Sequence, residues 1–202
     1  MAMFKFEQLE NNIFYFTDTI PETKKLVKFI DDTDYDDSIK ENSISKWRTW
    51  YASNDKTTIY GQQKMIDLSY IKKSEDISSR VLFIVNSIRR PILKCTEMYK
   101  SFLNIDGEVK LDDQFGINRY FKDAEMGPHA DQADGNLSLR YSIVTYLNDD
   151  YEGGEIEFPN QSIKIKPIAG SSIIFPSSEP YLHRSHKIIS GEKYMCPSFW
   201  LW

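Results

Sequence analysis

Two side chains that commonly bind metals stand two residues apart in the tripeptide His129-Ala130-Asp131. On an extended strand, residues i and i+2 point to the same face, so this spacing presents an imidazole and a carboxylate to one cation. The chain has only three histidines, and the other two, His183 and His186, lie far downstream. Either of them is a candidate third ligand.

Two histidines and one carboxylate occupy one face of an octahedral ion and leave its remaining positions open. Open positions are typical of non-haem Fe(II) oxygenases, whereas a structural zinc site is closed by four protein ligands. A lone His-x-Asp is common by chance, and these residues alone do not decide which histidine is the third ligand. The tripeptide predicts an iron site only if the residues that follow support it.

The elements that position these residues are expected to be strands. After Gly107 the chain alternates between short β-rich segments and clusters of Gly, Pro, Asn and Asp. Such spacing is typical of a sandwich or barrel. Seven strands are predicted, at 114–121, 137–147, 155–158, 162–165, 171–175, 182–189 and 194–202.

The first half of the chain is expected to be mainly helical. A short strand is predicted at 13–17, a helix from Pro21 to residue 32, a polar loop at 34–46, and a core or core-edge aromatic patch at 47–51. Apolar residues at spacings of three and four predict a long helix over 74–102, which Pro91 should bend or split because it lacks a backbone donor. We therefore expect an α+β fold in one domain, 1–202, with helical support (1–106) packed on an antiparallel core (107–202).

The core carries motifs in a distinctive order. They are NRY at 118–120, GPHAD at 127–131, YLN at 146–148, YEGGE at 151–155, KPIAGS at 166–171, IIFP at 173–176, and then His183, Ile188, Gly191, Lys193 and Tyr194. In these motifs, residues 118–202 resemble the prolyl 4-hydroxylase-like group of Fe(II)- and 2-oxoglutarate-dependent dioxygenases. The resemblance implies a double-stranded β-helix, or jelly roll, as the core.

The resemblance also implies roles for individual residues. His129, Asp131 and His183 are expected to hold the iron, because His183, unlike His186, stands eight residues before Gly191 and ten before Lys193. His186 is then expected to be a surface or hydrogen-bonded histidine.

The co-substrate site follows from the same motifs. Lys193 is implied to meet the distal carboxylate of 2-oxoglutarate through a charge-assisted hydrogen bond worth about 1.5 to 3 kcal/mol. Tyr120 and Tyr146 resemble the family's co-substrate tyrosines, although a strand tyrosine is often simply part of a core.

Three further expectations concern the pocket. Arg140 and Ser142 share strand parity with Tyr146, so both should face the barrel interior, with Arg140 a candidate substrate contact. Pro197 interrupts the family's spacing before Phe199 and Trp200 and predicts a bulge, which leaves open which of these two aromatic residues approaches the pocket. The segments 34–46 and 52–63 are candidates for a lid.

The implied reaction couples decarboxylation of 2-oxoglutarate to succinate and CO2 with hydroxylation of a C–H bond by O2. The prolyl 4-hydroxylase-like group acts on peptidyl proline and is commonly described as binding ascorbate. Two alternatives stay open: the same chemistry on a free amino acid or other small molecule, and a non-catalytic jelly-roll binding module. The carboxylate of Asp131 argues against halogenation, because halogenating relatives need that position vacated for chloride.

The composition of the chain indicates which partners and which cell compartment to expect. The net charge of −5 offers no basic field for nucleic acid. Two cysteines do not indicate a disulfide framework, and neither a signal peptide nor a membrane-spanning apolar run is recognisable. We expect a cytoplasmic protein without a membrane anchor, of a compact length that suits a bacterial or viral enzyme; the oligomeric state is not readable.

Overall fold

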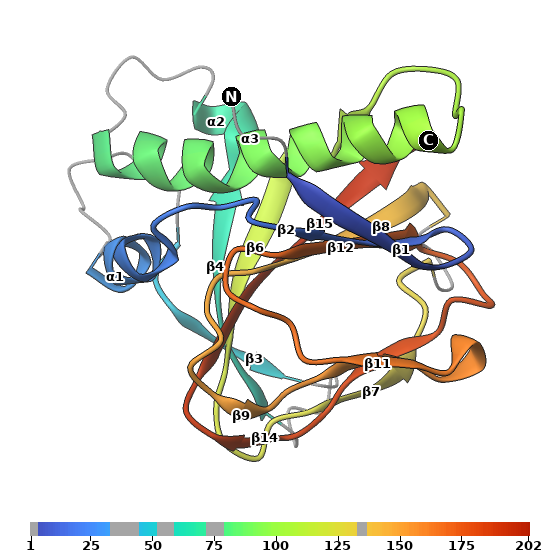
Figure 1. Ribbon diagram of the computed structural model, residues 1–202. Coiled ribbons are helices and arrows are strands. Elements are labelled where there is room, and N and C mark those ends of the chain that lie inside the picture. Colours follow the sequence, from blue (N-terminus) through green and yellow to red (C-terminus); the bar gives the residue numbers. More distant parts are fainter. Residues whose placement is uncertain (1–3, 33–44, 52–58, 72–78, 133–136) are drawn as a thin grey trace.

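Two facing β-sheets form the body of the molecule, and helices cover the outer face of the larger sheet (Figure 1). The computed structural model describes residues 4–32, 45–51, 59–71, 79–132 and 137–202. In the larger sheet the spatial order is β1 (Lys5–Glu10), β2 (Ile13–Thr17), β12 (Ser172–Pro176), β8 (Leu139–Tyr146), β15 (Lys193–Leu201), β6 (Gln114–Tyr120), β4 (Ile59–Asp67) and β3 (Arg48–Tyr51), with β5 (Lys110–Leu111) also paired to β15.

The smaller sheet faces this one across the molecule. Its order is β11 (Ile163–Ile165), β10 (Ile156–Phe158), β13 (His183–Ser185) and β7 (Met126–His129), and a separate pair joins β14 (Ile188–Ser190) to β9 (Glu152–Gly153). All pairings among the described strands are antiparallel. The predicted α+β jelly-roll architecture is confirmed.

The larger sheet separates two hydrophobic cores. Successive side chains of a strand point to opposite faces, so neighbours in β12 divide between them: Ile174 packs toward the helices, while Ile173 and Phe175 pack between the sheets. Residues of β15 divide in the same way, with Cys196 in the first core and Met195 in the second. The inter-sheet core is where a pocket lined from both sheets is able to form.

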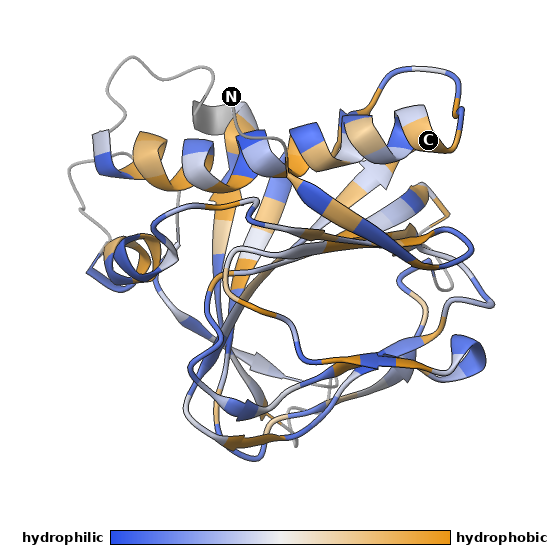
Figure 2. Cartoon of the chain, in the orientation of Figure 1, coloured by the Kyte–Doolittle hydropathy of each residue, from blue (hydrophilic) through white to orange (hydrophobic). Residues whose placement is uncertain are grey.

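Two helices close the outer core. α1 (Thr23–Asp32) buries Leu26 and Ile30, and α3 (Ser79–Phe102) buries an apolar stripe that includes Ile84, Ile88 and Ile92. Both colours of the hydropathy scale alternate along these helices in Figure 2, as amphipathic helices require. A single turn, α2 (Leu68–Ile71), and a 3-10 turn (Pro159–Gln161) complete the helical elements described, and no helix in those residues is long and apolar enough to cross a membrane.

Several sequence expectations need correction. The N-terminal part is not only helical, because β1 to β4 all join the larger sheet. α3 is one helix with Pro91 inside it, so of the two outcomes expected at this proline, a split and a bend, the split is wrong. The strand expected at 182–189 divides into β13 and β14, and residues 34–44, 52–58 and 74–78, which carry parts of the predicted loop, lid and helix, lie outside the described residues.

The bulge predicted at Pro197 is also wrong. β15 pairs with β8 through this residue, opposite Val144, and the register shifts only later, at Trp200. On its other side β15 pairs with β6 through residues 193–195 and with β5 through residues 200–201. Pro197 therefore lies in a stretch that has one partner strand, where a missing N–H is tolerated.

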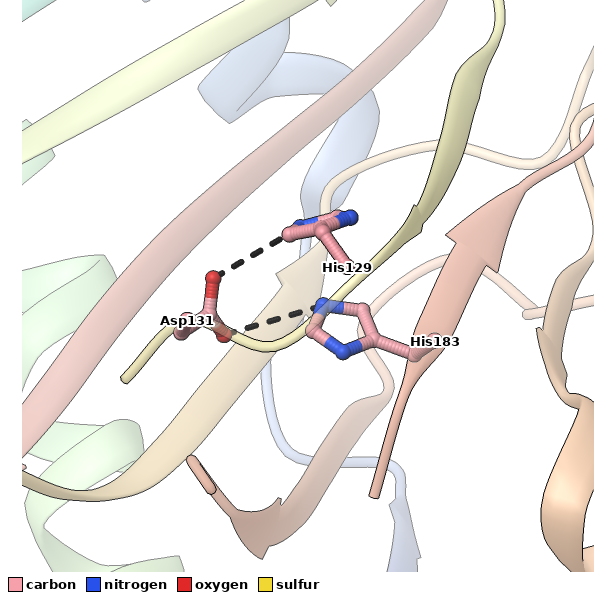
Figure 3. A group of neighbouring side chains, drawn as sticks. All are labelled: His129, Asp131 and His183. Carbon is pink, nitrogen blue, oxygen red and sulfur yellow. Dashed lines mark ion pairs between the residues drawn. The ribbon is translucent and has the colours of Figure 1, made fainter. Parts of the chain in front are cut away.

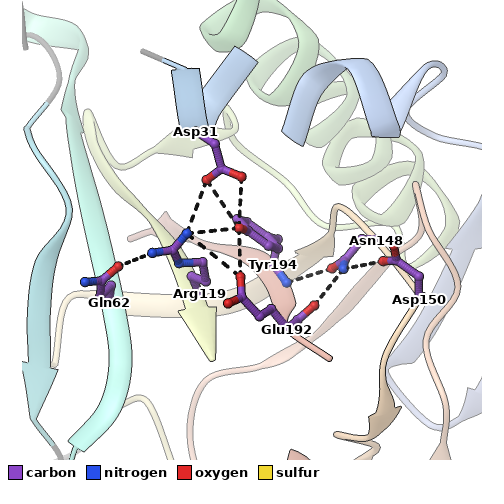
Figure 4. Close-up of polar contacts among 7 residues, drawn as sticks. All are labelled: Asp31, Gln62, Arg119, Asn148, Asp150, Glu192 and Tyr194. Carbon is purple, nitrogen blue, oxygen red and sulfur yellow. Dashed lines mark hydrogen bonds and ion pairs between the residues drawn. The ribbon is translucent and has the colours of Figure 1, made fainter. Parts of the chain in front are cut away.

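A polar network ties α1 to the sheet (Figure 4). Nη1 of Arg119 on β6 lies 3.6 Å from an oxygen of Asp31 in α1 and 3.8 Å from Glu192, and it donates to the hydroxyl of Tyr194 on β15 at 3.2 Å. Arg119 also donates to Gln62 on β4. This network fixes the outer face of the strands whose inner face carries the predicted co-substrate residues.

Candidate active site

The structure brings His129, Asp131 and His183 together (Figure 3). Their nearest ligand atoms all lie within 4.8 Å of one another. Nε2 of His129 is 3.7 Å from Oδ1 of Asp131, and Nε2 of His183 is 3.6 Å from Oδ2. Ligands about 2.1 Å from an octahedral ion lie about 3 Å apart on one face, so a small contraction would let these atoms share a cation.

Strand pairing explains the convergence. His129 ends β7 and stands opposite His183 on β13, and their ring centroids are 4.3 Å apart. Asp131 lies two residues beyond His129, just past the end of β7 rather than on a continuing strand. His129 and Asp131 therefore point to the same side, as the i, i+2 spacing predicts, although strand β7 ends earlier than expected.

Both imidazoles present the same nitrogen to the site. Nδ1 of His129 lies 2.9 Å from the carbonyl oxygen of Gly127, and Nδ1 of His183 lies 3.4 Å from that of Tyr181. A carbonyl accepts but does not donate, so each Nδ1 must carry the hydrogen and each Nε2 keeps a lone pair for a metal. Orientation of this type is typical of histidine ligands.

Asp131 is held as a carboxylate. The hydroxyl of Ser142 donates to its Oδ2 at 2.6 Å, and Ser142 in turn lies 2.8 Å from the hydroxyl of Ser177. Burial alone would raise the pKa of Asp131, but the adjacent His129 imidazole, the charge of His183 and the hydrogen bond from Ser142 together hold that pKa below its ordinary value. An ionised carboxylate is the form that binds a divalent cation.

The two histidines differ in protonation. Burial lowers the pKa of His183 to about 4, despite the opposing charge of Asp131. Burial also acts to lower the pKa of His129, but the adjacent carboxylate of Asp131 and the hydrogen bond to the Gly127 carbonyl outweigh this effect and raise it. His183 is therefore neutral and ready to bind at neutral pH, and a cation would compete with a proton only at His129.

A second group of predicted residues meets beside this cluster. Lys193, Tyr120 and Tyr146 are all buried and line the same cavity, and the Lys193 ammonium lies 5.5 Å and 5.3 Å from the two ring centroids. Its Nζ donates to the carbonyl oxygen of Gly154 at 2.8 Å and to the hydroxyl of Ser185 at 2.9 Å. Burial lowers the pKa of Lys193 to about 7.

The cavity itself lies between the two sheets. It has a volume of about 240 Å³. Its wall contains the three candidate metal ligands, His129, Asp131 and His183, together with Lys193, Tyr120 and Tyr146. Apolar side chains, among them Val144, Ile156 and Phe199, make up much of the remainder. Such a wall strengthens electrostatic interactions inside the cavity.

Comparison with known proteins identifies the family. Residues 115–202 match the model of the 2OG-Fe(II) oxygenase superfamily. A PKHD-type hydroxylase of Prochlorococcus marinus strain AS9601 is 41% identical over 159 residues, which are 77% of this chain and 68% of the relative. The chain belongs to this hydroxylase family. A second PKHD-type hydroxylase, from strain MIT 9515, is 25% identical over 161 residues, covering 76% of this chain and 67% of that relative.

Solved structures share the hydroxylase fold over nearly the whole chain. A 2OG-Fe(II) oxygenase family oxidoreductase from Burkholderia pseudomallei gives a TM-score of 0.59 at 15% identity and covers 95% of this chain and 86% of its own. A Trichoplax adhaerens prolyl hydroxylase, solved with a hypoxia inducible factor peptide fragment, gives a TM-score of 0.61 at 11% identity and covers 95% and 84%. At these identities the likeness shows the fold alone.

Family membership makes the chain a dioxygenase of the prolyl 4-hydroxylase-like type, which uses Fe(II), 2-oxoglutarate and O2. The residues present fit these groups. Two imidazole nitrogens and a carboxylate form the donor set of a non-haem iron site, and the buried hydroxyl of Tyr120 has no hydrogen-bond partner among the described residues. That hydroxyl is available to a bound co-substrate.

The remaining predictions of the hydroxylase site have mixed outcomes. Arg140 does not line the cavity: its guanidinium lies 4.6 Å from the ring centroid of Trp202 and 5.1 Å from that of Trp200. Ser142, with the same parity, does face the site. Phe199 lines the cavity, whereas Trp200 is buried in the core beneath the helices.

His186 behaves as expected for a histidine outside the hydroxylase site. Its Nε2 lies 2.5 Å from Oε2 of Glu157, and it is absent from the cavity wall. Trp50 lines the cavity although the sequence did not predict it, and Gln63 lines it from the end of the lid candidate 52–63, whose described part, 59–63, lies in strand β4. Trp50 belongs to an aromatic patch that the sequence predicted as core or core edge, and nothing in the local sequence distinguishes its role.

Proposed function

We propose that this chain hydroxylates a prolyl residue in a peptide, with iron held by His129, Asp131 and His183. The observation that carries the proposal is the convergence of these three side chains, whose ligand atoms lie within 4.8 Å of one another in the wall of a small cavity. When bound, Fe(II), 2-oxoglutarate and O2 supply the oxidative decarboxylation that is coupled to hydroxylation of an unactivated C–H bond.

Lys193, Tyr120 and Tyr146 are proposed to hold 2-oxoglutarate. Lys193 makes two hydrogen bonds through a group that has three N–H donors, so one donor is left for the distal carboxylate. The Tyr120 hydroxyl supports the same assignment, because a buried hydroxyl without a partner is costly until a ligand oxygen satisfies it. Tyr146 closes the other side of the ammonium.

The size and chemistry of the cavity favour a single small side chain as acceptor. Its volume of about 240 Å³ is below the roughly 300 to 1,000 Å³ typical of pockets for larger ligands. A pyrrolidine ring is compact and uncharged, so it leaves water for an apolar wall at less cost than a charged side chain. These properties support peptidyl proline as the acceptor.

The alternatives fit less well. A free amino acid brings an ammonium and a carboxylate that need partners, whereas Lys193 is proposed to bind the co-substrate and Arg184 is engaged by Glu157. A non-catalytic binding module is disfavoured by the family to which the chain belongs. We also infer a reducing, intracellular setting, in which both buried cysteines remain thiols and ascorbate is available to keep iron ferrous.

The experiment measures succinate formed by the purified protein with Fe(II) and 2-oxoglutarate. Acceptors are a panel of proline-containing peptides, the same peptides with alanine for proline, and free amino acids, with mass spectrometry to detect the added oxygen atom. Proline-dependent succinate and an oxygenated peptide are expected. Stimulation by free amino acids alone would overturn the peptide assignment.

A matched variant tests the iron ligands. Asp131→Ala is expected to lose both bound iron and turnover, including the slow acceptor-free consumption of 2-oxoglutarate. Retention of either by a folded variant would remove Asp131 from the iron site. Glu157→Ala, which removes a carboxylate from β10, two strands away from β7 in the smaller sheet, is the control and is expected to retain both.

A further inference from the structure

Part of the cavity wall is left unassigned by the proposed function. The iron and co-substrate residues all lie within 115–202, the range that matches the family model. Trp50 and Gln63 are the two described lining residues from outside that range. Both come from the β3–β4 pair at one edge of the larger sheet.

A glycine brings this pair close to the co-substrate residues. Gly61 on β4 stands opposite Trp50 on one side and opposite Tyr120 of β6 on the other. A Cβ on Gly61 would lie 2.0 Å from the carbonyl oxygen of Arg119, so only glycine permits this approach. The Trp50 indole therefore lies edge-on to the Tyr120 ring, with centroids 5.5 Å apart.

Trp50 is braced from its other side. The ring centroid of Tyr60 is 5.0 Å away, at an interplanar angle of 60°. Edge-to-face pairs of this type add about 0.5 to 1.5 kcal/mol beyond simple burial. The indole is thus a fixed apolar surface inside the cavity.

Gln63 adds a polar group beside this surface. Its Nε2 donates to Oδ1 of the buried Asn118, directly across from it on β6, at 2.7 Å. Among the described residues, this is the one side-chain hydrogen bond that Gln63 and Asn118 make, so the Gln63 oxygen and the Asn118 nitrogen are left for a ligand. If both amides were turned over, the roles would exchange, and the pair would still offer one acceptor and one donor.

An amide pair with one free donor and one free acceptor complements a peptide group. Gly116 leaves room for the amide pair, since a Cβ on this residue would lie 2.7 Å from the Gln63 nitrogen. Neither Trp50 nor Gln63 carries a charge, so this side of the cavity offers no partner for the ionic ends of a free amino acid. The same surface suits a ring embedded in a main chain.

We propose that Trp50 and Gln63 form the acceptor-binding wall, with the indole packed against the prolyl ring and the Gln63 amide hydrogen-bonded to the adjoining main chain. This inference rests on the proposed function, and it assigns the selection of peptide over free amino acid to the N-terminal half of the chain. Trp50 and Gln63 are then specificity residues, separate from those that hold iron and 2-oxoglutarate.

The test compares Trp50→Leu and Gln63→Leu with Gln62→Leu. Gln62 is the adjacent residue of β4, and its side chain accepts a hydrogen bond from Arg119 on the opposite face of the sheet. Each variant is assayed for KM with the best proline peptide, for anaerobic binding of that peptide by fluorescence anisotropy, and for acceptor-free 2-oxoglutarate consumption. Trp50→Phe serves as a conservative rescue that keeps an aromatic ring.

We expect each wall variant to raise KM and weaken peptide binding about tenfold, the equivalent of one lost hydrogen bond or packing contact. Acceptor-free consumption should be unchanged, Gln62→Leu should match wild type, and Trp50→Phe should recover most of the binding. Wild-type peptide affinity in both wall variants would overturn the inference. So would a parallel loss of acceptor-free consumption, because the wall would then belong to the co-substrate site.

Different results would contradict the proposed function and the assignment of the acceptor-binding wall. If wild type consumes 2-oxoglutarate but hydroxylates no proline peptide, the proposed acceptor is wrong, and the wall loses its occupant with it. If wild type hydroxylates the peptide and the wall variants do so equally well, only the wall assignment is wrong.

Discussion

The Lys193 side chain is buried, and its two hydrogen-bond partners, the Gly154 carbonyl and the Ser185 hydroxyl, are both neutral. Burial lowers its pKa to about 7, from an ordinary value of 10.5, and the nearby charge of Lys166 contributes to the shift. Above pH 7 the free protein therefore holds a neutral amine where a carboxylate is proposed to bind. Binding of 2-oxoglutarate must then be accompanied by uptake of a proton.

We predict that affinity for 2-oxoglutarate falls as pH rises from 7 toward 9, measured by anaerobic titration of the Fe(II) protein. Calorimetry in buffers of different ionisation enthalpy should detect the proton taken up. Lys193→Arg stays protonated and should flatten the profile; an unchanged affinity up to pH 9 in wild type would contradict the assignment. Between the Lys193 pKa of about 7 in the folded protein and its ordinary value of 10.5, the unfolded chain binds more protons than the folded chain. The free energy of unfolding of the ligand-free protein should therefore increase as pH rises through this range.

Ser142 is expected to control iron binding without touching the metal. Its hydroxyl donates to Asp131 at 2.6 Å and fixes the rotation of the carboxylate. Removing such a partner typically weakens metal binding by about 10-fold to 100-fold, so Ser142→Ala should raise the dissociation constant for Fe(II) by that factor in a chelator competition assay.

The matched control is Ser172→Ala. Ser172 is equally buried and hydrogen-bonds to Thr145 on the same strand as Ser142, away from the cluster. It is expected to leave iron affinity unchanged. Equal losses in the two variants would mean that the Ser142 effect is one of general stability.

Individual residues show what the sequence was able to predict. The convergence of His129, Asp131 and His183, with Lys193 in the same cavity wall, was predictable because motif spacing carries their geometry. Arg140 was misplaced because strand parity gives the face of a strand but not the point where the cavity ends; it stacks on Trp202 instead. The position of Trp50 depends on a pairing between distant strands, which no local pattern records.

Among the elements, α3 is unusual in continuing through a proline. Pro91 lacks the N–H that an interior helical residue donates, yet the helix extends from Ser79 to Phe102. Burial of flanking residues such as Ile88 and Ile92 holds the helix against the sheet despite this defect. Tertiary packing here overrides a local preference, so the helix does not split at Pro91, the first of the two outcomes, split or bend, that the sequence predicted.

Pro91→Ala is predicted to stabilise the protein. The substitution restores a backbone donor, and after allowance for the greater freedom of the unfolded chain we expect a gain of about 1 to 2 kcal/mol in the free energy of unfolding. Urea denaturation measures this change. Leu93→Ala, at an exposed position of the same helix, should alter it by less than about 0.5 kcal/mol. A loss of stability in Pro91→Ala would show that the proline ring contributes packing that outweighs the missing bond.

Strand boundaries were predictable where a run rich in β-branched and aromatic residues lies between turn residues, as in β6, β8 and β12. β1 and β4 were missed because KFEQLE is mostly polar and the middle of IYGQQKMID is the loop-like run GQQK. They are strands because neighbours of the larger sheet offer them a ladder of backbone hydrogen bonds. That information lies in the rest of the fold rather than in the segments themselves.

At the scale of the molecule, the N-terminal segments flank the catalytic strands on both sides. β2 covers the edge of β12, and β4 covers the edge of β6. Removing them would expose two long hydrogen-bonding edges and the apolar face beneath α3. The two parts that the sequence distinguishes, 1–106 and 107–202, are therefore interleaved in space.

We predict that residues 107–202 expressed alone will not fold. Circular dichroism and size-exclusion chromatography should show aggregation or loss of cooperative unfolding, with the intact chain as reference. Co-expression with 1–106 should restore at least part of the soluble material, since the missing edges are then supplied. A monomeric fragment that unfolds cooperatively and binds Fe(II) would show that the catalytic strands suffice.

The pairing of β7 with β13 has a practical corollary. β7 is the outermost strand of the smaller sheet, and its register with β13 is short and irregular, with His129 opposite His183. A cation bound by both imidazoles would hold β7 against β13 more firmly than the backbone hydrogen bonds between the two strands do. Chelator treatment during purification should then first expose the chain around Met126 to protease, while the body of the molecule, on the far side of the cavity, stays resistant.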